Sequence, residues 1–201
     1  MDFFSDSFPN DQVHISYFEL ASRHQDANGS MTAEALQLLH TQQQKRAGKM
    51  VIVNAEQVAS LFHLSLGISR ALINQRDQLA LNHSNQAKSG KGLRTQNLGQ
   101  EVLYCLHPKH SINHALDVFG IPKVKKAFFL VALNAQVNEI EQAKGELRSS
   151  GVFDEIQALE MHFKSQDLDK IKKTFEIKEE EAADPAEMLS QVYQKLALKN
   201  L

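Results

Sequence analysis

Three histidines lie close together in the middle of the chain, where their spacing could build a metal site. His110 and His114 are four residues apart, as two ligands on one face of a helix would be, and His107 lies just before them. Zinc usually takes four ligands, often with a cysteine or a carboxylate among them. The nearby candidates are Cys105, which belongs to an apolar helix face, and Asp117. Because no His-Glu-x-x-His motif completes the set, we predict no metal here.

The same stretch has the residue order of a short capped helix. Ser111 is a candidate N-cap, and Gly120 stands where a glycine commonly follows the end of a helix. Pro122 would prevent the helix from continuing. These roles explain the segment without a ligand, so we interpret it as a structural corner that carries histidines.

A glycine-containing stretch resembles part of a phosphate-binding loop. Ser89-Gly90-Lys91-Gly92 contains the Gly-Lys pair, but the Walker pattern also needs a glycine five residues earlier and a serine or threonine afterwards. Asn85 and Gly92 occupy those two places, and no strong strand precedes the loop. We therefore interpret this stretch as a solvated basic loop.

The residues give little support to a catalytic function. Cys105 could act as a nucleophile only in an exposed, electropositive setting with a base such as His107. A single cysteine between Tyr104 and Leu106 is more typical of a small core residue. No Gly-x-Ser-x-Gly or Gly-x-Gly-x-x-Gly motif is present. We predict a protein that is not an enzyme, with no catalytic residues, no cofactor and no metal.

Two groups of basic residues could hold phosphates. One group precedes a predicted helix and the other follows one, and clustered cations dominate the affinity of proteins for nucleic acids. The alternative is ordinary surface charge, which also suits the end of a helix in the second group. The candidate RNA-binding residues are Lys88, Lys91, Arg94, Lys123, Lys125 and Lys126.

Length and composition favour a single globular domain. The chain has 201 residues, of which 42% are hydrophobic, with a net charge of -2 and one cysteine. We predict one domain over residues 1–201, with a disordered N-terminus of about residues 1–11 and a polar loop at about 83–92. The N-terminus lacks the pattern of a secretory signal, and no apolar run is long enough to span a membrane. A cytoplasmic and nuclear location is expected.

Hydrophobic periodicity predicts an α+β fold, with a small antiparallel sheet of about four strands, a layer of helices and a C-terminal helix. Strands are expected at 13–20, 50–53, 126–133 and 155–163, with an edge strand at 174–177. Helices are expected at 32–44, 54–74, 95–106, 112–119, 166–173 and from Pro185 onward, and 137–149 is a polar helix or loop.

The long helix predicted at 54–74 has two flanks, and either of them could be buried. Its broad apolar stripe is expected to face the core and consists of Val58, Leu61, Phe62, Leu66, Ile68, Leu72 and Ile73. The second flank is small and weakly polar, so a partner could approach it closely, although another part of the core could do the same. The candidate partner-binding residues on this flank are Ala59, His63, Gly67 and Arg70.

Several motifs together resemble one known family. They are Arg94-Thr95-x-x-Leu98-x-x-Glu101-Val102-Leu103, the turn at His107-Pro108, and Ser111-Ile112-x-x-Ala115-Leu116-x-x-Phe119-Gly120-Ile121. Val51-Ile52-Val53-Asn54-x-x-Gln57, followed by a long helix, fits as well. The chain resembles the TPRKB family, whose members are the PRPK-binding subunits of the EKC/KEOPS complex. The resemblance covers about residues 13–201 and is most specific from 51 to 121.

The resemblance implies a non-catalytic subunit with an α+β fold. Such a subunit binds the small atypical kinase of KEOPS directly, supports its ATPase activity, and meets the other subunits through it. The complex makes the threonylcarbamoyl modification of the adenosine next to the anticodon in ANN-decoding tRNAs. The family is also linked to binding the CCA end of tRNA, so the alternative is a tRNA-binding module in which kinase binding is secondary. Among the basic residues, Arg94 is the one that we match first to a basic position of the family.

Overall fold

A four-stranded antiparallel sheet forms the centre of the protein. The computed structural model describes residues 12–26, 30–84, 92–156, 163, 168–182 and 184–199. The strands are β1 (Val13–Leu20), β2 (Met50–Asn54), β3 (Ala127–Leu133) and β4 (Phe153–Ile156), in the order β2-β3-β1-β4. The predicted α+β class is confirmed, with the C-terminal helix in place.

The sheet has the connections of a split βαβ fold. Helix α1 (Ala33–Lys45) joins β1 to β2, and α5 (Val137–Ser149) joins β3 to β4. Every neighbouring pair of strands is antiparallel, and β3 lies between β1 and β2. The remaining helices belong to an insertion between β2 and β3 and to a C-terminal extension after β4.

Each face of the sheet carries its own core, because side chains alternate along a strand. Phe128, Leu130 and Ala132 of β3 pack with α1 and α5 in one core, whereas Phe129 and Val131 belong to the other. All seven residues of β3 are buried, which explains its nearly continuous apolar sequence. The strand that looked central in the sequence is therefore covered on both faces.

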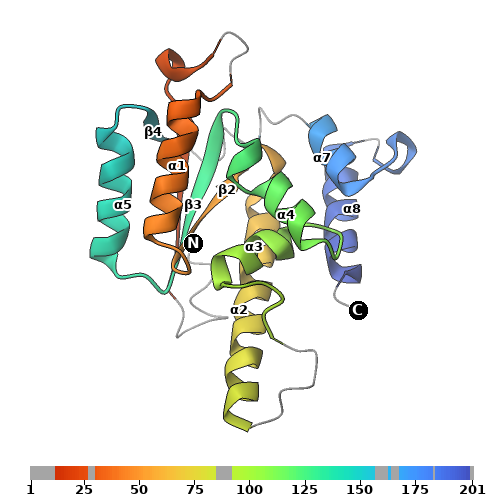
Figure 1. The fold of residues 1–201 in the computed structure, drawn as a ribbon. Helices are drawn as coiled ribbons and strands as arrows, with labels where there is room; N and C mark the ends of the chain where they lie inside the picture. Colours follow the sequence, from red (N-terminus) through yellow and green to blue (C-terminus); the bar gives the residue numbers. More distant parts are fainter. Residues whose placement is uncertain are drawn as a thin grey trace.

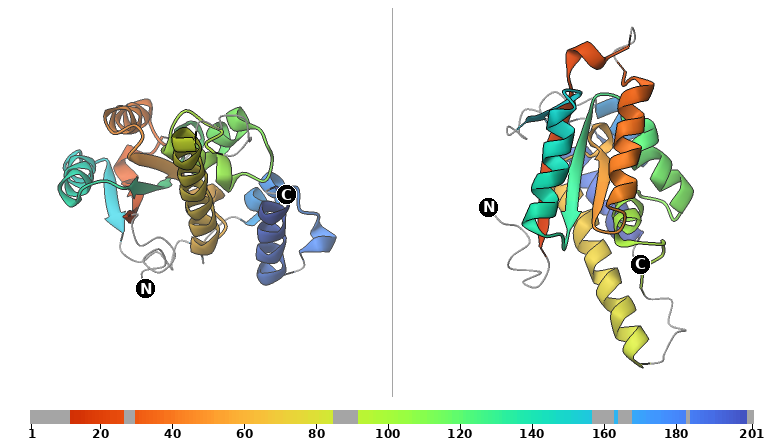
Figure 2. Two further views of the ribbon diagram at one scale, coloured as in Figure 1. Left: turned by 90° about the horizontal axis from the view of Figure 1, so that it is seen from below. Right: turned by 60° about the vertical axis from the view of Figure 1, so that its left-hand side comes forward.

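Five of the helices whose bounds the structure describes contribute to the second core. They are α2 (Leu61–Ser84), α3 (Leu98–Leu106), α4 (Ile112–Phe119), α7 (Leu168–Phe175) and α8 (Pro185–Leu198). Short 3₁₀ turns lie at Ser22–His24, Ala55–Gln57, Ile121–Lys123 and Glu179–Glu181. Figure 1 shows α1 and α5 together on one side and α8 far from them, and the view from below in Figure 2 shows the same arrangement. The distal half of α2 extends beyond the sheet in Figure 1. No helix among the described residues is both long and apolar enough to cross a membrane.

Several helix starts follow the caps that the sequence indicates. The Thr32 hydroxyl accepts the backbone N–H of Ala35, and the Ser111 hydroxyl accepts that of His114. Asp184 caps α8, and Pro185 is its first residue. These local side-chain contacts set the N-terminal ends of α1, α4 and α8 where the sequence predicts them.

The predicted start of the long helix is wrong. Asn54 caps only the short turn Ala55–Gln57, because its side chain accepts the Glu56 N–H, and α2 begins at Leu61. The Asn54 amide is buried and donates to the carbonyls of Val118 and Lys123, which ties the end of β2 to the end of α4 and to the turn after it.

The C-terminal third holds fewer strands than expected. Thr174 and Phe175 end α7, so the edge strand predicted at 174–177 is wrong, and β4 begins at Phe153, before the strand predicted from 155. The rest of that predicted strand, apart from Phe163, lies outside the described residues. The predicted disordered N-terminus and most of the predicted polar loop also lie outside the described residues. The first two residues of that loop, His83 and Ser84, end α2.

The reason for a glycine after α4 also differs from the expected one. Gly120 has a φ of -88°, so a left-handed backbone is not what requires it. A Cβ atom there would lie 2.3 Å from the carbonyl oxygen of Leu116. The glycine therefore permits a close approach of backbone to backbone at the corner.

Candidate partner-binding surface

The small flank predicted for the long helix faces inward, and so does part of the predicted apolar stripe, because Val58, Ile68 and Leu72 are fully buried. Ala59 and His63 are buried, and Gly67 lies against Leu106 of α3. Phe62 and Ile73, which were expected in the core, are 44% and 39% exposed. The proposed kinase contacts Ala59, His63 and Gly67 are thus interior residues, and a partner cannot reach them in this structure.

His63 connects four elements of the second core. Its Nδ1 accepts the Ala59 N–H at 3.1 Å, so its Nε2 carries the proton and donates to the Leu106 carbonyl at 3.0 Å. The rings of Phe119 and Phe175 lie edge-on to it at 5.8 and 5.3 Å. Burial lowers the pKa of His63 from 6.5 to about 4, so the imidazole is neutral at physiological pH.

Gly67 and Arg70 lie where α2 meets α3. A Cβ atom on Gly67 would lie 2.6 Å from Cδ2 of Leu106, so only glycine allows this close helix contact. Arg70 is half-buried, and its Nε is buried without a hydrogen-bond partner. Its guanidinium lies near enough to Cys105 to favour the thiolate electrostatically. Arg70 is thus the one member of the predicted set with partial access to solvent.

The outward face of α2 presents the accessible apolar surface. Leu61 and Phe62 are exposed in the first turn, and the Phe62 ring packs edge-on against Tyr193 of α8 at 5.0 Å. The Tyr193 hydroxyl is 2.8 Å from the Ser60 hydroxyl, which fixes α8 beside the start of α2. Two segments far apart in the sequence therefore build one apolar patch, which we call the α2–α8 patch: Leu61, Phe62 and Tyr193.

Four of the basic residues predicted to bind RNA lie in the part of the chain that the structure describes, and they lie in two places. Arg94 is exposed just before α3, whose Gly99 lies against Val51 at the start of β2. Lys123 follows α4, near Asn54 at the other end of β2, and pairs with Asp117 at 3.7 Å. Lys125 and Lys126 are exposed in the same segment, whereas Lys88 and Lys91 lie outside the described residues. Arg94 and the Lys123–Lys126 segment thus lie near opposite ends of β2.

A buried carboxylate holds the segment around Arg94 in place. Glu101 is fully buried, and its Oε2 accepts the backbone N–H groups of Arg94 and Thr95 and the Thr95 hydroxyl at 2.9–3.0 Å. Its Oε1 accepts from the Asn74 amide of α2 at 2.7 Å. Sequence reasoning quoted Glu101 only as part of a motif; its spacing from Thr95, with an apolar helix around it, is the signal that could have indicated this role.

The histidine corner is held by contacts within the protein. Nδ1 of His107 accepts the Lys109 N–H at 3.0 Å, and its ring lies edge-on to that of His114 at 4.8 Å. His110 hydrogen-bonds to the Tyr104 hydroxyl at 3.1 Å. Among the residues that the structure describes, no three potential ligand side chains are grouped as for a metal ion.

Lys199 fastens the end of α8 to this corner. Its ammonium is buried, donates to the carbonyls of Tyr104 and His107, and lies 3.5 Å from the centre of the Tyr104 ring. Burial lowers the pKa of Lys199 to about 8. The lysine satisfies carbonyl groups at the end of α3, which is a role typical of cations at helix C-termini.

Cys105 has the surroundings of a core residue. Its thiol is buried, and burial raises its pKa to about 12. A thiol that keeps its proton at neutral pH is a poor nucleophile. The geometry therefore favours the interpretation of Cys105 as packing against α2 over the catalytic one.

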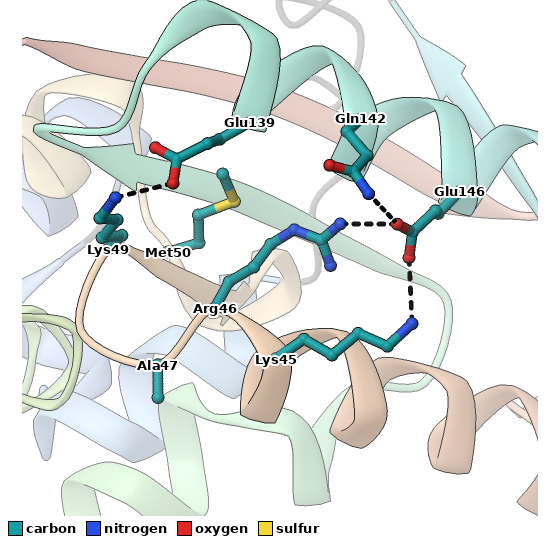
Figure 3. Close-up of a pocket in the computed structure, with 8 residues that line it drawn as sticks. All are labelled: Lys45, Arg46, Ala47, Lys49, Met50, Glu139, Gln142 and Glu146. Carbon is teal, nitrogen blue, oxygen red and sulfur yellow. Dashed lines mark hydrogen bonds and ion pairs between the residues drawn. The ribbon is translucent and has the colours of Figure 1, made fainter.

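A groove of about 530 Å³ lies on the opposite side of the sheet, between α1 and α5 (Figure 3). Ion pairs join its walls: Lys49 to Glu139 at 2.7 Å, Arg46 to Glu146 at 2.9 Å and Lys45 to Glu146 at 3.3 Å. Hydrogen bonds from Gln42 and then from the cations lower the pKa of Glu146 to about 2. Every charged group that lines the groove is paired within it, so we interpret the groove as a clamp between the two helices.

One protein family matches the chain. Its model, described as kinase binding protein CGI-121, covers residues 29–200 and so includes every element from α1 to α8. A search of curated proteins finds no match.

Proposed function

The chain belongs to the CGI-121 family of kinase-binding proteins, which is the TPRKB family that the sequence resembles, and from this premise we propose that it is a non-catalytic KEOPS subunit. In this proposal it binds the small atypical kinase of the complex and supports the ATPase activity of that kinase. The other subunits are reached through the kinase, and the complex modifies ANN-decoding tRNAs. A cytoplasmic and nuclear location is part of the proposal.

The observation that carries the docking site is the α2–α8 patch. Leu61 and Phe62 are more than two-fifths exposed, and Tyr193 packs beside Phe62. Large apolar side chains that stay exposed next to one another, with polar residues around them, are typical of protein interfaces. Aromatic residues are also the side chains on which binding energy most often concentrates. We therefore place the kinase on this patch.

The test is co-expression with the kinase subunit from the same organism, followed by size-exclusion chromatography and calorimetric titration. We expect a one-to-one complex, and a Phe62→Asp substitution should weaken it at least tenfold because it places a charge in a desolvated contact. Val137→Asp is the matched control, since Val137 is an apolar residue 64% exposed on α5. Equal affinity of the Phe62→Asp and Val137→Asp variants would remove the patch as the docking site, and separate peaks for the wild-type proteins would contradict kinase binding.

Binding of tRNA by this subunit is the second candidate function. Its support is the exposed pair Lys125 and Lys126, next to Lys123. If these lysines bind phosphates, the affinity for tRNA should fall steeply as salt increases, and removal of the two charges should make that slope shallower. A salt-independent affinity, or an unchanged slope for the Lys125→Ala/Lys126→Ala variant, would contradict direct tRNA binding through this segment.

A further inference from the structure

We propose that Arg70 and Arg94 together form a binding site for a carboxylate, and that an aspartate or glutamate side chain of the kinase occupies it. We call these two residues the arginine pair. The inference rests on the proposed function, because it names a polar contact of the kinase interface next to the apolar contact at the α2–α8 patch.

The arginine pair differs from the other arginines of the chain in having no partner. The sequence has six arginines, and all of them lie in the described residues. Four of them have partners within the protein: Arg23, Arg46, Arg76 and Arg148. In the part of the chain that the structure describes, the guanidinium groups of Arg70 and Arg94 have neither a hydrogen bond nor an ion pair. A guanidinium is a planar fork of N–H donors, so one without acceptors can receive an oxyanion.

Contacts around α3 bring the two arginines to one place. Arg70 and Asn74 are four residues apart on α2, so they are neighbours on the same face of the helix. The Asn74 amide donates to Glu101 of α3 at 2.7 Å, and the same carboxylate accepts the backbone N–H of Arg94 at 2.9 Å. The arginine pair is thus connected through Asn74 and Glu101, with one member on α2 and the other in the segment before α3.

Both guanidinium groups lie beside the same turn of α3. Burial is the main cause that raises the pKa of Tyr104 and of Cys105, which are consecutive residues. The charge of Arg94 opposes this rise at Tyr104, and the charges of Lys199 and then Arg70 oppose it at Cys105. Because such effects weaken with distance, three cations lie close to this turn.

No carboxylate of the described residues neutralises the arginine pair. Glu101 accepts hydrogen bonds from Asn74, from the Thr95 hydroxyl and from two backbone N–H groups, and none from a guanidinium. Asp77 lies about two turns farther along α2 and, within the described ranges, forms no ion pair with either arginine. The site therefore keeps an excess of positive charge, which a carboxylate of a partner would complement.

The Nε atom of Arg70 gives the clearest indication of a binding role, because it is buried without a hydrogen-bond partner. An unsatisfied buried donor is costly, so each such atom in a folded protein needs an explanation. The Nε and one Nη of an arginine can donate side by side to the two oxygens of a carboxylate. Arg70 is half-buried and Arg94 is exposed, so a partner can reach both. A carboxylate bound there would satisfy the Nε of Arg70.

The position of the arginine pair favours a carboxylate of the kinase over a phosphate of RNA. Arg70 follows Phe62 by eight residues on α2, which is about 12 Å along the helix axis. An interface of about 800 Å² per partner is about 30 Å across, so one partner can cover both residues. RNA binding instead needs several cations along a phosphate backbone, and the basic segment Lys123–Lys126 lies near the opposite end of β2.

The first test measures whether the geometry of arginine is needed. Arg70→Lys and Arg94→Lys should each weaken kinase binding at least fivefold in calorimetric titration, because lysine keeps the charge but cannot donate two parallel hydrogen bonds. Arg148→Lys is the matched control, since Arg148 of α5 already pairs with Glu141 and Glu155, and it should change the affinity less than twofold. A loss for only one member of the pair, or losses no larger than that of the control, would overturn the arginine pair.

The second test separates a binding role from a structural one. Arg70→Met removes the unsatisfied donor and keeps an unbranched side chain. We expect the urea midpoint of the isolated protein to stay the same or to rise, while kinase binding weakens. A lower midpoint would show that Arg70 stabilises the fold, and it would overturn the unsatisfied state on which the site depends.

The third test identifies the carboxylate. Arg70→Glu should remove kinase binding, because it places like charges opposite each other. Kinase variants in which one exposed aspartate or glutamate is replaced by arginine should include one that restores binding to Arg70→Glu at least tenfold. A complete set of such kinase variants without any restoration would overturn the carboxylate as the occupant.

The outcomes also separate this inference from the proposed function. If Phe62→Asp weakens kinase binding and the arginine variants do not, the arginine pair is overturned while the docking site stands. If the wild-type proteins form no complex, the proposed function fails and the inference fails with it. If Arg70→Lys and Arg94→Lys lower the affinity for tRNA and leave that for the kinase unchanged, the site binds an RNA phosphate and the kinase carboxylate is overturned.

Discussion

His63 and His107 are buried as neutral imidazoles, each with its Nδ1 accepting a backbone N–H. Burial is the main cause that lowers the pKa of both side chains to about 4. In the unfolded chain a histidine titrates near 6.5. Between these two values the unfolded state binds more protons than the folded state, so the free energy of unfolding decreases as the pH falls from about 6.5 to about 4.

The size of this effect can be checked directly. From pH 7 to pH 5 each buried histidine should lower the free energy of unfolding by about 2 kcal/mol, which urea denaturation at the two pH values would measure. His107→Asn keeps an acceptor for the Lys109 N–H but cannot titrate, so it should remove about half of the loss. A wild-type protein equally stable at pH 7 and pH 5 would contradict the neutral, buried state of these residues.

Residue-level reasoning from the sequence succeeds where a side chain acts on its own neighbours. Thr32, Ser111 and Asp184 cap the helices that their positions indicate, because the capping bond reaches only two or three residues along the chain. Asn54 was wrongly predicted to start the long helix, because its amide donates hydrogen bonds to carbonyls more than sixty residues away. Glu101 accepts one of its hydrogen bonds from Asn74 of another helix, and no local sequence pattern predicts that contact.

At the scale of elements, α2 shows why periodicity alone cannot orient a helix. The helix has two apolar or small flanks, and each could pack against a core. The choice depends on the shape of α3: Leu106 fills the space over Gly67, so only the small flank fits there. The bulkier flank, with Phe62 and Ile73, is left on the surface. Three of the four candidate docking residues, Ala59, His63 and Gly67, therefore lie inside the protein.

Two helical glycines provide a matched test of this packing. Gly67→Ala should lower the free energy of unfolding by about 1–3 kcal/mol, because the new methyl group overlaps the buried Leu106 side chain. Gly145→Ala on α5, where a Cβ meets nothing within 4 Å, should raise it by up to about 1 kcal/mol through helix propensity. Urea denaturation of both variants measures the contrast, and a stabilising Gly67→Ala would contradict the close contact of α2 with α3.

At the scale of the whole molecule, the fold class follows from the sequence but the strand order does not. The strands at β1, β2 and β3 are recognisable from their residues, and β3 is correctly predicted as central. The pairing of β1 with β3 joins residues more than a hundred positions apart, and no turn sequence specifies it. The strand order depends on tertiary packing, because each face of the sheet must be covered by its own hydrophobic core.

This arrangement predicts a gradient of stability across the sheet. β1 and β3 each have a strand on both sides, whereas β4 is a four-residue edge strand. Amide hydrogen exchange under native conditions should therefore be slowest in β1 and β3, where opening requires global unfolding, and faster in β4. Exchange of β3 at the rate of β4 would contradict the central position of β3.

The order of the strands also bears on how the protein is made. β1 pairs only with β3 and β4, and β2 pairs only with β3, so every strand pair requires residues from 127 onward. While the chain emerges from the ribosome, β1 and β2 must wait through the synthesis of the whole α2–α4 insertion before a partner strand exists. Apolar strands kept unpaired for that time are exposed to aggregation, which is the situation that chaperones relieve. The α2–α4 insertion thus lengthens the time during which β1 and β2 of the nascent chain lack a partner strand.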